Sequence, residues 1–151
     1  MSYPSDLGQQ VIIAASLLAR SYRRQADLAL KSCGLSEVMA WPVLVVGRRD
    51  GLRQIELAEL LGIEGPSLVR NLDRVEAAGF IERRADPTDR RAKTLHLTAA
   101  GRALSLRIED VLADLSQRSF DGIPAADLNT CLAVFGQVDA ALARGAQGAT
   151  T

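Results

Sequence analysis

The first part of the chain carries an apolar side chain at every third or fourth position. The pattern covers residues 7 to 31 and consists of Leu7, Val11, Ala14, Leu18, Tyr22, Ala26 and Ala29. This spacing places the side chains on one face of a long helix, which we expect to end at Gly34. A second helix is predicted after Ser36, which serves as its N-terminal cap, and continues to about Gly47.

Two shorter helices are predicted next, one on each side of a glycine. Residues 54 to 61 are expected to bury Ile55, Ala58 and Leu61, and Gly62 supplies the left-handed backbone that ends this helix. The following helix starts near Pro66 and ends at Gly79. Its inner stripe consists of Leu68, Leu72 and Val75. Two short helices joined by a tight turn are typical of a helix-turn-helix.

The pattern then changes from helical to alternating. Residues 80 to 84 and 93 to 97 are predicted strands on either side of a polar loop, with Leu95 and Leu97 on one face of the second strand. We therefore expect a hairpin with a long charged tip. Thr98 is expected to cap a helix from Ala99 to about Gln117, and a last helix is predicted from about Pro124 to Leu142.

Composition and charge refine this picture. Apolar residues make up 48% of the 151 residues and aromatic residues only 4%, which favours a mostly α fold in one domain. The net charge is zero, but residues 48 to 107 hold 12 Arg and Lys against 9 acidic residues, while residues 108 to 151 hold 2 against 6. A basic middle and an acidic end predict one polarised surface for nucleic acid.

One face of the helix that starts at Pro66 carries the groups that read bases. Ser67, Arg70, Asn71 and Arg74 are three, four and seven residues apart, so they project together. Hydroxyl, amide and guanidinium groups on the second helix of such a pair can bind base edges in the major groove of DNA. The alternative interpretation is an ordinary solvated helix face.

The predicted hairpin tip is strongly basic. Residues 83 to 93, RRADPTDRRAK, contain five basic residues and two acidic ones. A loop held at a fixed distance from a recognition helix can insert an arginine into a narrow minor groove, where the potential is most negative. We interpret Asp89 as a partner that orients a neighbouring guanidinium. The alternative is a solvated charged hairpin.

Residues 62 to 101, GIEGPSLVRNLDRVEAAGFIERRADPTDRRAKTLHLTAAG, resemble the MarR family of regulators, and its SlyA-like members in particular. The motifs IEGPSLVR, AAG, DRRAK and LT-x-x-G occur in the family's order and spacing. The resemblance is weaker over residues 54 to 63, and only the layout agrees in the terminal helices. It implies a mostly α, winged helix-turn-helix domain of residues 1–151, with a DNA-binding lobe at about 36–98 and dimerisation helices at about 5–32 and 99–145.

The resemblance also implies roles for individual residues. Pro66, Ser67 and Arg70 match recognition-helix positions that reach the major groove, Arg90 matches the wing arginine of the minor groove, and Asp89 and Arg91 match its supporting ion-pair positions. Lys93 and Thr98 are expected near phosphates or as structural caps. The first, fifth and sixth helices are expected to form a homodimer, which accounts for the apolar Val11, Leu18 and Leu112. A twofold dimer requires a pseudo-palindromic operator in double-stranded DNA.

The predicted function is therefore a sequence-specific transcriptional regulator, most simply a repressor. Relatives respond to small aromatic carboxylates or phenolic compounds. Arg20, Tyr22 and Trp41 are the candidate lining of such an effector pocket, although core packing is the preferred interpretation of Trp41. Another alternative is a redox sensor that uses Cys33, although this residue lies at the exit of the first helix. Cys131 is interpreted as a core or interface residue.

The sequence predicts no enzyme activity, cofactor or metal site. His96 is the only histidine and is interpreted as an ordinary strand side chain, and neither cysteine has a partner at metal-ligand spacing. A winged-helix protein-interaction module without specific DNA binding remains the alternative from another class. The start of the chain lacks a signal-peptide pattern and no apolar run is long enough to span a membrane, so we expect a cytoplasmic protein.

Overall fold

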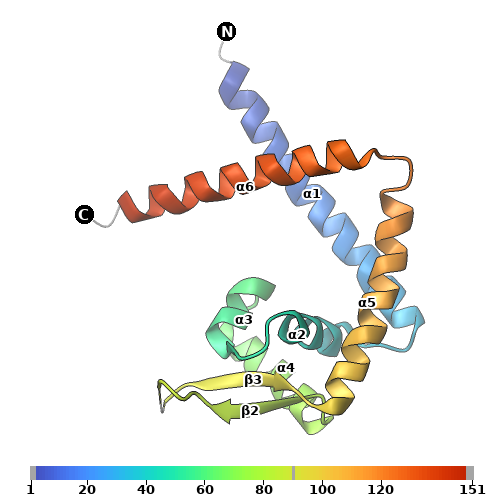
Figure 1. Cartoon of the computed structure of the whole chain (residues 1–151), viewed down its shortest axis with the longest axis vertical. Coiled ribbons are helices and arrows are strands. Elements are labelled where there is room, and N and C mark those ends of the chain that lie inside the picture. The colour runs from blue at the N-terminus through green and yellow to red at the C-terminus, as the bar shows by residue number, and fades with distance from the viewer. Residues whose placement is uncertain (1–2, 90, 149–151) are drawn as a thin grey trace. The chain divides into compact units, whose positions relative to one another are not determined.

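The computed structural model describes residues 3–89 and 91–148 (Figure 1). The chain divides into two compact units, Met1–Ser116 and Gln117–Thr151. The elements in chain order are α1 (Tyr3–Ser32), α2 (Glu37–Arg48), β1 (Leu52–Arg53), α3 (Gln54–Leu61), α4 (Gly65–Ala77), β2 (Ile81–Ala85), β3 (Lys93–Leu97), α5 (Ala99–Ser119) and α6 (Ala125–Gly148). The prediction of a mostly α fold is confirmed. No helix in these described ranges is both long and apolar enough to cross a membrane.

A small antiparallel sheet lies beside α2, α3 and α4 in the first unit. Its strand order is β1-β3-β2, with Leu52 opposite Leu95 and Ile81 opposite Leu97. The sequence pattern predicted β2 and β3 but not β1, because two residues are too few to show an alternating period. The β2–β3 hairpin extends beyond the helices at its free end (Figure 1). We call residues 37–97, from α2 to β3, the lobe.

The core of the lobe is made of aliphatic side chains from every surrounding element. The completely buried ones include Leu30, Val43, Val46, Leu57, Leu68, Val75, Leu95 and Ile108. They confirm the predicted inner stripe of α4, in which Leu72 is buried as well. Helix α2 packs against α1, α3, α4 and β3, so it is the central element of this core. Burial of this much aliphatic surface is the main stabilising contribution to the lobe.

Helix α3 corrects one expectation about the core. Leu61 is buried as predicted and Ala58 is half-buried, but Ile55 is 67% exposed and Leu57 is buried in its place. Apolar residues occupy several faces of this eight-residue helix, so its pattern allowed more than one inner stripe. The choice between them was made by packing, because α2 and α4 approach the side that carries Leu57 and Leu61.

The ends of the helices follow the predicted signals closely. Gly62 and Gly79 have positive φ angles of 62° and 78°, which L side chains rarely adopt, and they end α3 and α4. The Thr98 hydroxyl accepts a hydrogen bond from the Gly101 N–H at 3.0 Å and donates one to the Gly79 carbonyl at 2.6 Å. Thr98 therefore caps α5 as predicted and also joins its start to the end of α4. Ser36 occupies the cap position of α2, but its side chain makes no capping hydrogen bond.

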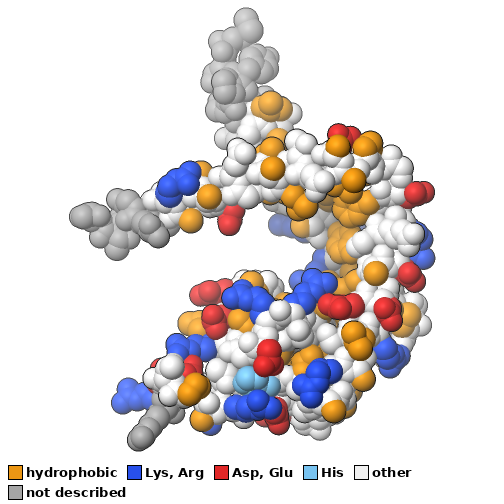
Figure 2. Space-filling view, viewed as in Figure 1, with side chains coloured by type: hydrophobic (Ala, Val, Ile, Leu, Met, Phe, Trp, Pro, Cys, Tyr) orange, Lys and Arg blue, Asp and Glu red, His pale blue; other side chains and the backbone are white. Residues whose placement is uncertain are grey.

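The second unit consists mainly of α6, which begins at Ala125 as predicted and continues beyond Leu142. Many of its apolar side chains are exposed, including Leu132, Val134, Phe135 and Leu142. The N-terminal part of α1 has the same property, with Leu7, Val11, Ile12, Ile13, Leu17 and Leu18 exposed. Hydrophobic side chains are accordingly visible on the surface of both terminal helices (Figure 2).

Candidate nucleic-acid interface

Helix α4 is the most clearly amphipathic element of the lobe. Leu68, Leu72 and Val75 anchor one side in the core, while Pro66, Val69, Arg70, Asp73 and Arg74 are exposed. Arg70 donates a weak hydrogen bond of 3.4 Å to the Ser67 hydroxyl, so these two predicted residues lie together. The buried stripe fixes the rotation of the helix about its axis, and that rotation is what presents Arg70 and Arg74 to solvent.

Asn71 departs from the face predicted for it. Its side chain is half-buried and lines a small cavity together with Trp41. At 100° per residue, position 71 lies on the border between the exposed arginines and the buried leucines. The structure therefore groups Ser67, Arg70 and Arg74 and places Asn71 partly against α2.

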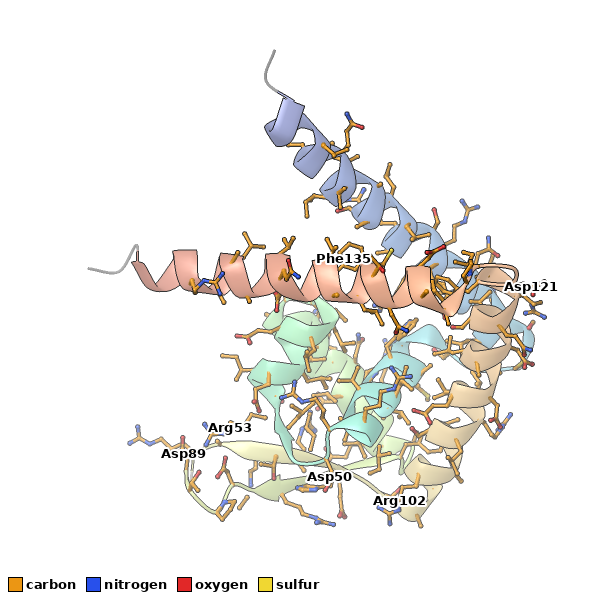
Figure 3. All side chains as sticks on the ribbon, turned by 45° about the horizontal axis from the view of Figure 1, so that its top comes forward. Asp50, Arg53, Asp89, Arg102, Asp121 and Phe135 are labelled. Carbon is orange, nitrogen blue, oxygen red and sulfur yellow. The ribbon has the colours of Figure 1, made fainter. Side chains whose placement is uncertain are left out.

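The loop of the hairpin is braced by Asp86, which the sequence analysis did not single out. One carboxylate oxygen accepts hydrogen bonds from the Thr88 backbone N–H at 2.7 Å and the Thr88 hydroxyl at 2.6 Å. The other accepts one from Nε of Arg53 at 2.7 Å. Arg53 belongs to β1, and Figure 3 shows it at the same end of the sheet as Asp89 in the hairpin tip. This brace ties the strand that precedes α3 to the loop of the hairpin.

These contacts stabilise the ionised form of Asp86. The hydrogen bonds from Thr88, and then that from Arg53, hold the pKa of this carboxyl well below its ordinary value, although burial acts in the opposite direction. The hydrogen bond with Asp86, and then the charge of Asp86, raise the pKa of Arg53 in turn. The Asp86 side chain is only 6% exposed, so a charge at this position requires the partners it has.

Asp89 closes a turn in the hairpin loop. Its carboxylate accepts the backbone N–H of Arg91 at 2.9 Å, and its carbonyl accepts that of Ala92 at 3.0 Å. The side chain is short enough to bond the N–H two residues along, which closes a turn. Within the part of the chain that the structure describes, Asp89 and Arg91 do not form the predicted ion pair. Arg90, the predicted wing arginine, lies outside the described residues.

Two of the five basic residues counted in the hairpin are occupied by acidic partners. Arg83 forms ion pairs with Asp73 at 2.7 Å and with Glu76, both from α4, while Arg84 pairs with Glu82. Arg83 therefore joins β2 to the recognition-helix candidate, a role that sequence spacing did not reveal. Arg91 and Lys93 are exposed, and within the described ranges neither forms an ion pair. Basic and acidic side chains lie next to one another near the free end of the hairpin (Figure 2).

His96 connects β3 with the turn before β1. One ring nitrogen bonds Asp50 at 3.0 Å and the other bonds the Thr94 hydroxyl at 3.0 Å. Figure 3 labels Asp50 beside the sheet. These contacts fit a structural strand side chain. The described part of the chain contains no cluster of three or more His, Cys, Asp or Glu side chains that could hold a metal ion.

The three predicted effector residues do not share one cavity. Arg20 lines a cavity of about 960 Å³ along α1, while Trp41 lines a separate one of about 230 Å³. The Tyr22 hydroxyl instead lies 2.7 Å from that of Ser116 and joins α1 to α5. Spacing along the sequence could not decide which of these aromatic side chains faces a cavity.

Trp41 also has two partners in α1 that the sequence analysis missed. Its indole N–H donates a hydrogen bond of 2.8 Å to the Asp27 carboxylate, and the guanidinium of Arg23 lies 4.1 Å from the centre of its ring. The spacing of four residues between Arg23 and Asp27 indicated that they share a helix face, but nothing in the sequence linked that face to Trp41.

Both cysteines are exposed. Cys33 lies at the end of α1, with its sulfur 3.9 Å from the Ser32 hydroxyl. Cys131 is exposed on α6, so a place in the core of its own unit is excluded and the interface interpretation remains.

Comparison with known proteins supports the fold and the family. The model of the MarR family matches residues 38–92. The transcriptional regulator PA3341 is 33% identical, with a TM-score of 0.79 over 87% of this chain and 97% of that one. A MarR family regulator from Silicibacter pomeroyi is 26% identical, with a TM-score of 0.72 over 83% and 86% of the two chains. A Listeria monocytogenes protein described as a MarR family regulator, solved with 26mer DNA, shares the fold at 18% identity, a TM-score of 0.75 and coverage of 88% and 89%.

The α3–α4 pair and the β2–β3 hairpin define a winged helix-turn-helix. The chain belongs to the MarR family of transcriptional regulators. The predicted fold class and family are thus confirmed, and the SlyA-like subtype stays a prediction.

Proposed function

We propose that the protein is a sequence-specific DNA-binding repressor that recognises a pseudo-palindromic operator as a twofold homodimer. The observation that carries this proposal is the exposed side of α4, where Arg70 and Arg74 project from a helix whose other side is locked in the core. Membership of a family of transcriptional regulators supports the same conclusion.

In this proposal α4 and the hairpin contact different parts of the duplex. Arg70, placed next to Ser67, binds a guanine edge in the major groove, because a guanidinium can bond the two acceptors of guanine. Arg90 enters the minor groove, and Arg91 and Lys93 contact phosphates. The brace of Asp86, Thr88 and Arg53 keeps the hairpin loop in place relative to the sheet.

The homodimer is proposed to use the helices of about residues 5–32 and 99–145. Its support is the exposed apolar surface of α1 and α6, which a chain on its own leaves in contact with water. Cys131 fits this interface because it is exposed on α6. Sedimentation at micromolar concentration tests the proposal, and a folded monomer alone would contradict it.

We further propose that a small aromatic carboxylate or phenolic anion releases the DNA. The cavity along α1 supports a negatively charged ligand, since Arg20, Arg23, Arg24 and Lys31 line it with a single carboxylate, that of Asp27. Oxidation of the exposed Cys33 is the alternative signal. Release of the DNA by oxidants, together with no effect of aromatic carboxylates, would favour that alternative. The cytoplasmic location stays a prediction.

Fluorescence anisotropy with DNA from the protein's own promoter region tests the central proposal. Wild type is expected to prefer this DNA over a scrambled duplex, and its affinity should fall steeply with salt, because phosphate contacts release counterions. Arg90→Ala should weaken binding and reduce any preference for A·T-rich flanks. Equal affinity for promoter and scrambled DNA would favour the protein-interaction module.

A further inference from the structure

Arg23 of α1 lies in the wall between two cavities. The larger, of about 960 Å³, follows α1 and reaches Leu35 and Ser36. The smaller, of about 230 Å³, is bounded by Trp41 of α2 and Asn71 of α4 among others. Arg23 and Asp27 are the two side chains that line both. One turn of α1 thus connects the large cavity with the surroundings of α4.

The larger cavity has an excess of positive charge. Four cations line it, namely Arg20, Arg23, Arg24 and Lys31, and within the described ranges none of them forms an ion pair. The carboxylate of Asp27, the one acidic side chain in the lining, accepts the indole N–H of Trp41. Unpaired guanidinium groups favour a carboxylate or phosphate ligand, which they bind through charge-assisted hydrogen bonds.

Arg23 is distinguished from the other three cations by its present contact. Its guanidinium lies over the ring of Trp41, 4.1 Å from the centre, while Asp27 holds the N–H edge of the same ring. A carboxylate in the larger cavity offers Arg23 a bidentate ionic hydrogen bond, which is stronger than the attraction of the cation to the ring. If an anion draws Arg23 away, Trp41 loses its cation–π partner and keeps the hydrogen bond to Asp27 and its packing against the core.

Trp41 is placed so that a change in its position affects α4. Its ring and Asn71 line the same small cavity, and α2 packs directly against α4. Asn71 is half-buried and directly follows Arg70, which is exposed. A Trp41 ring displaced into this cavity would approach Asn71 and so change the surroundings of α4.

We infer that Arg23 is a coupling residue, through which a small organic anion in the α1 cavity repositions Trp41 and, through it, α4. The effect on DNA rests on the proposed function. The movement of Arg23 and Trp41 does not, so the two can be tested separately.

Trp41 is the only tryptophan in the chain, so its emission reports the contact directly. The full-length protein is titrated with benzoate, and benzamide, which has the same ring without the charge, is the control. Benzoate is expected to change the emission saturably, and benzamide is expected to leave it unchanged. In Arg23→Gln the emission change should disappear at saturating benzoate, while calorimetry still detects binding to the remaining cations.

Arg24→Gln is the matched variant, because Arg24 lines only the larger cavity. It should raise the benzoate concentration for half-saturation by about two- to fivefold, the effect of one exposed ion pair, and keep the full emission change. Arg23→Lys, which retains the cation, should restore part of the change that Arg23→Gln loses. Circular dichroism confirms that each variant is folded.

Four results would overturn the inference. They are failure of wild type to bind benzoate, binding without a change in emission, an unaltered emission change in Arg23→Gln, and loss of benzoate binding in Arg23→Gln, which would make Arg23 a ligand-binding residue only. With promoter DNA present, benzoate should release wild type but not Arg23→Gln. Absence of DNA binding in wild type would contradict the proposed function, and the emission result would still decide the coupling.

Discussion

The lobe and the N-terminal half of α1 carry similar apolar stripes, but the stripes are buried in the lobe and exposed on α1. In the lobe Leu57, Leu68 and Leu95 are completely buried, whereas Leu7 and Leu18 of α1 are 64% and 62% exposed. A stripe in the sequence shows that a helix face avoids water, but it does not show what covers that face. The stripes of the lobe are covered within the chain, whereas the exposed stripe of α1 fits the proposed contact with a second copy.

Gly101→Ala is the change expected to damage the lobe most. A Cβ at this position would lie 1.9 Å from the backbone carbonyl oxygen of Phe80, so α5 and the turn before β2 must separate. We expect a loss of about 3 kcal/mol in the free energy of unfolding, at the upper end of overpacking effects. Urea unfolding followed by circular dichroism measures it.

The control for this variant is Gly65→Ala, since a Cβ at Gly65 has no neighbouring atom within 4 Å. Its unfolding midpoint should stay close to that of wild type. An equal effect of the two substitutions would show that the close packing of Gly101 against Phe80 is not important for stability.

Leu18→Glu tests the other side of the comparison. A carboxylate in an apolar subunit contact loses its hydration, so the dimer dissociation constant should rise by about 100-fold or more. The lobe should remain folded, because the Leu18 side chain is exposed within the chain. Sedimentation measures the oligomeric state and circular dichroism the fold.

Ile55→Glu is the matched control for Leu18→Glu, because Ile55 is an equally exposed apolar residue, but in the lobe. It should leave the oligomeric state unchanged. If Ile55→Glu dissociates the dimer and Leu18→Glu does not, the subunit contact lies on the lobe and the comparison fails.

Arg70→Ala examines the exposed side of α4. Loss of a base contact should weaken operator binding by about 1 to 3 kcal/mol and relax the preference at particular base pairs. Arg107→Ala, at an exposed arginine of α5, is the control and should bind as wild type does. Anisotropy with single-base operator variants measures both, and unchanged specificity in Arg70→Ala would argue against the assigned base contact.

Of these substitutions, Asp86→Asn should change the protein least, and its effect should be confined to the hairpin. Since the pKa of folded Asp86 lies below its ordinary value of 3.8, the ionised carboxylate stabilises the hairpin at pH values above 3.8, and this contribution is lost as the pH falls further through the lower pKa. The amide signal of Thr88, followed by NMR, should therefore titrate only below pH 3.8 in wild type. Titration near or above that value would contradict the brace.

The variant should lack this titration at every pH, because an amide side chain does not ionise. Its DNA affinity at neutral pH should fall by about two- to fivefold, the effect of a weakened contact near the surface. An affinity equal to that of wild type would show that the hairpin needs no brace to bind DNA.

Much of the local structure was predictable because it depends on neighbours in the sequence. The inner stripe of α4, the glycines that end α3 and α4, and the cap formed by Thr98 were all predicted correctly. Each depends on residues within a few positions, where backbone geometry and hydrogen bonding are fixed by residue type. The exposed Arg70 follows from the same helical period.

Other features depended on contacts between distant segments, and only the tertiary structure decided them. Helix α3 buries Leu57 rather than Ile55 because α2 and α4 approach that side. Arg83 pairs with α4, and Asp86 binds Arg53 of β1, 33 residues earlier in the chain. Charge and spacing show that such groups need partners, but several partners are equally compatible with the sequence, and the choice is made by which elements the packed core brings together.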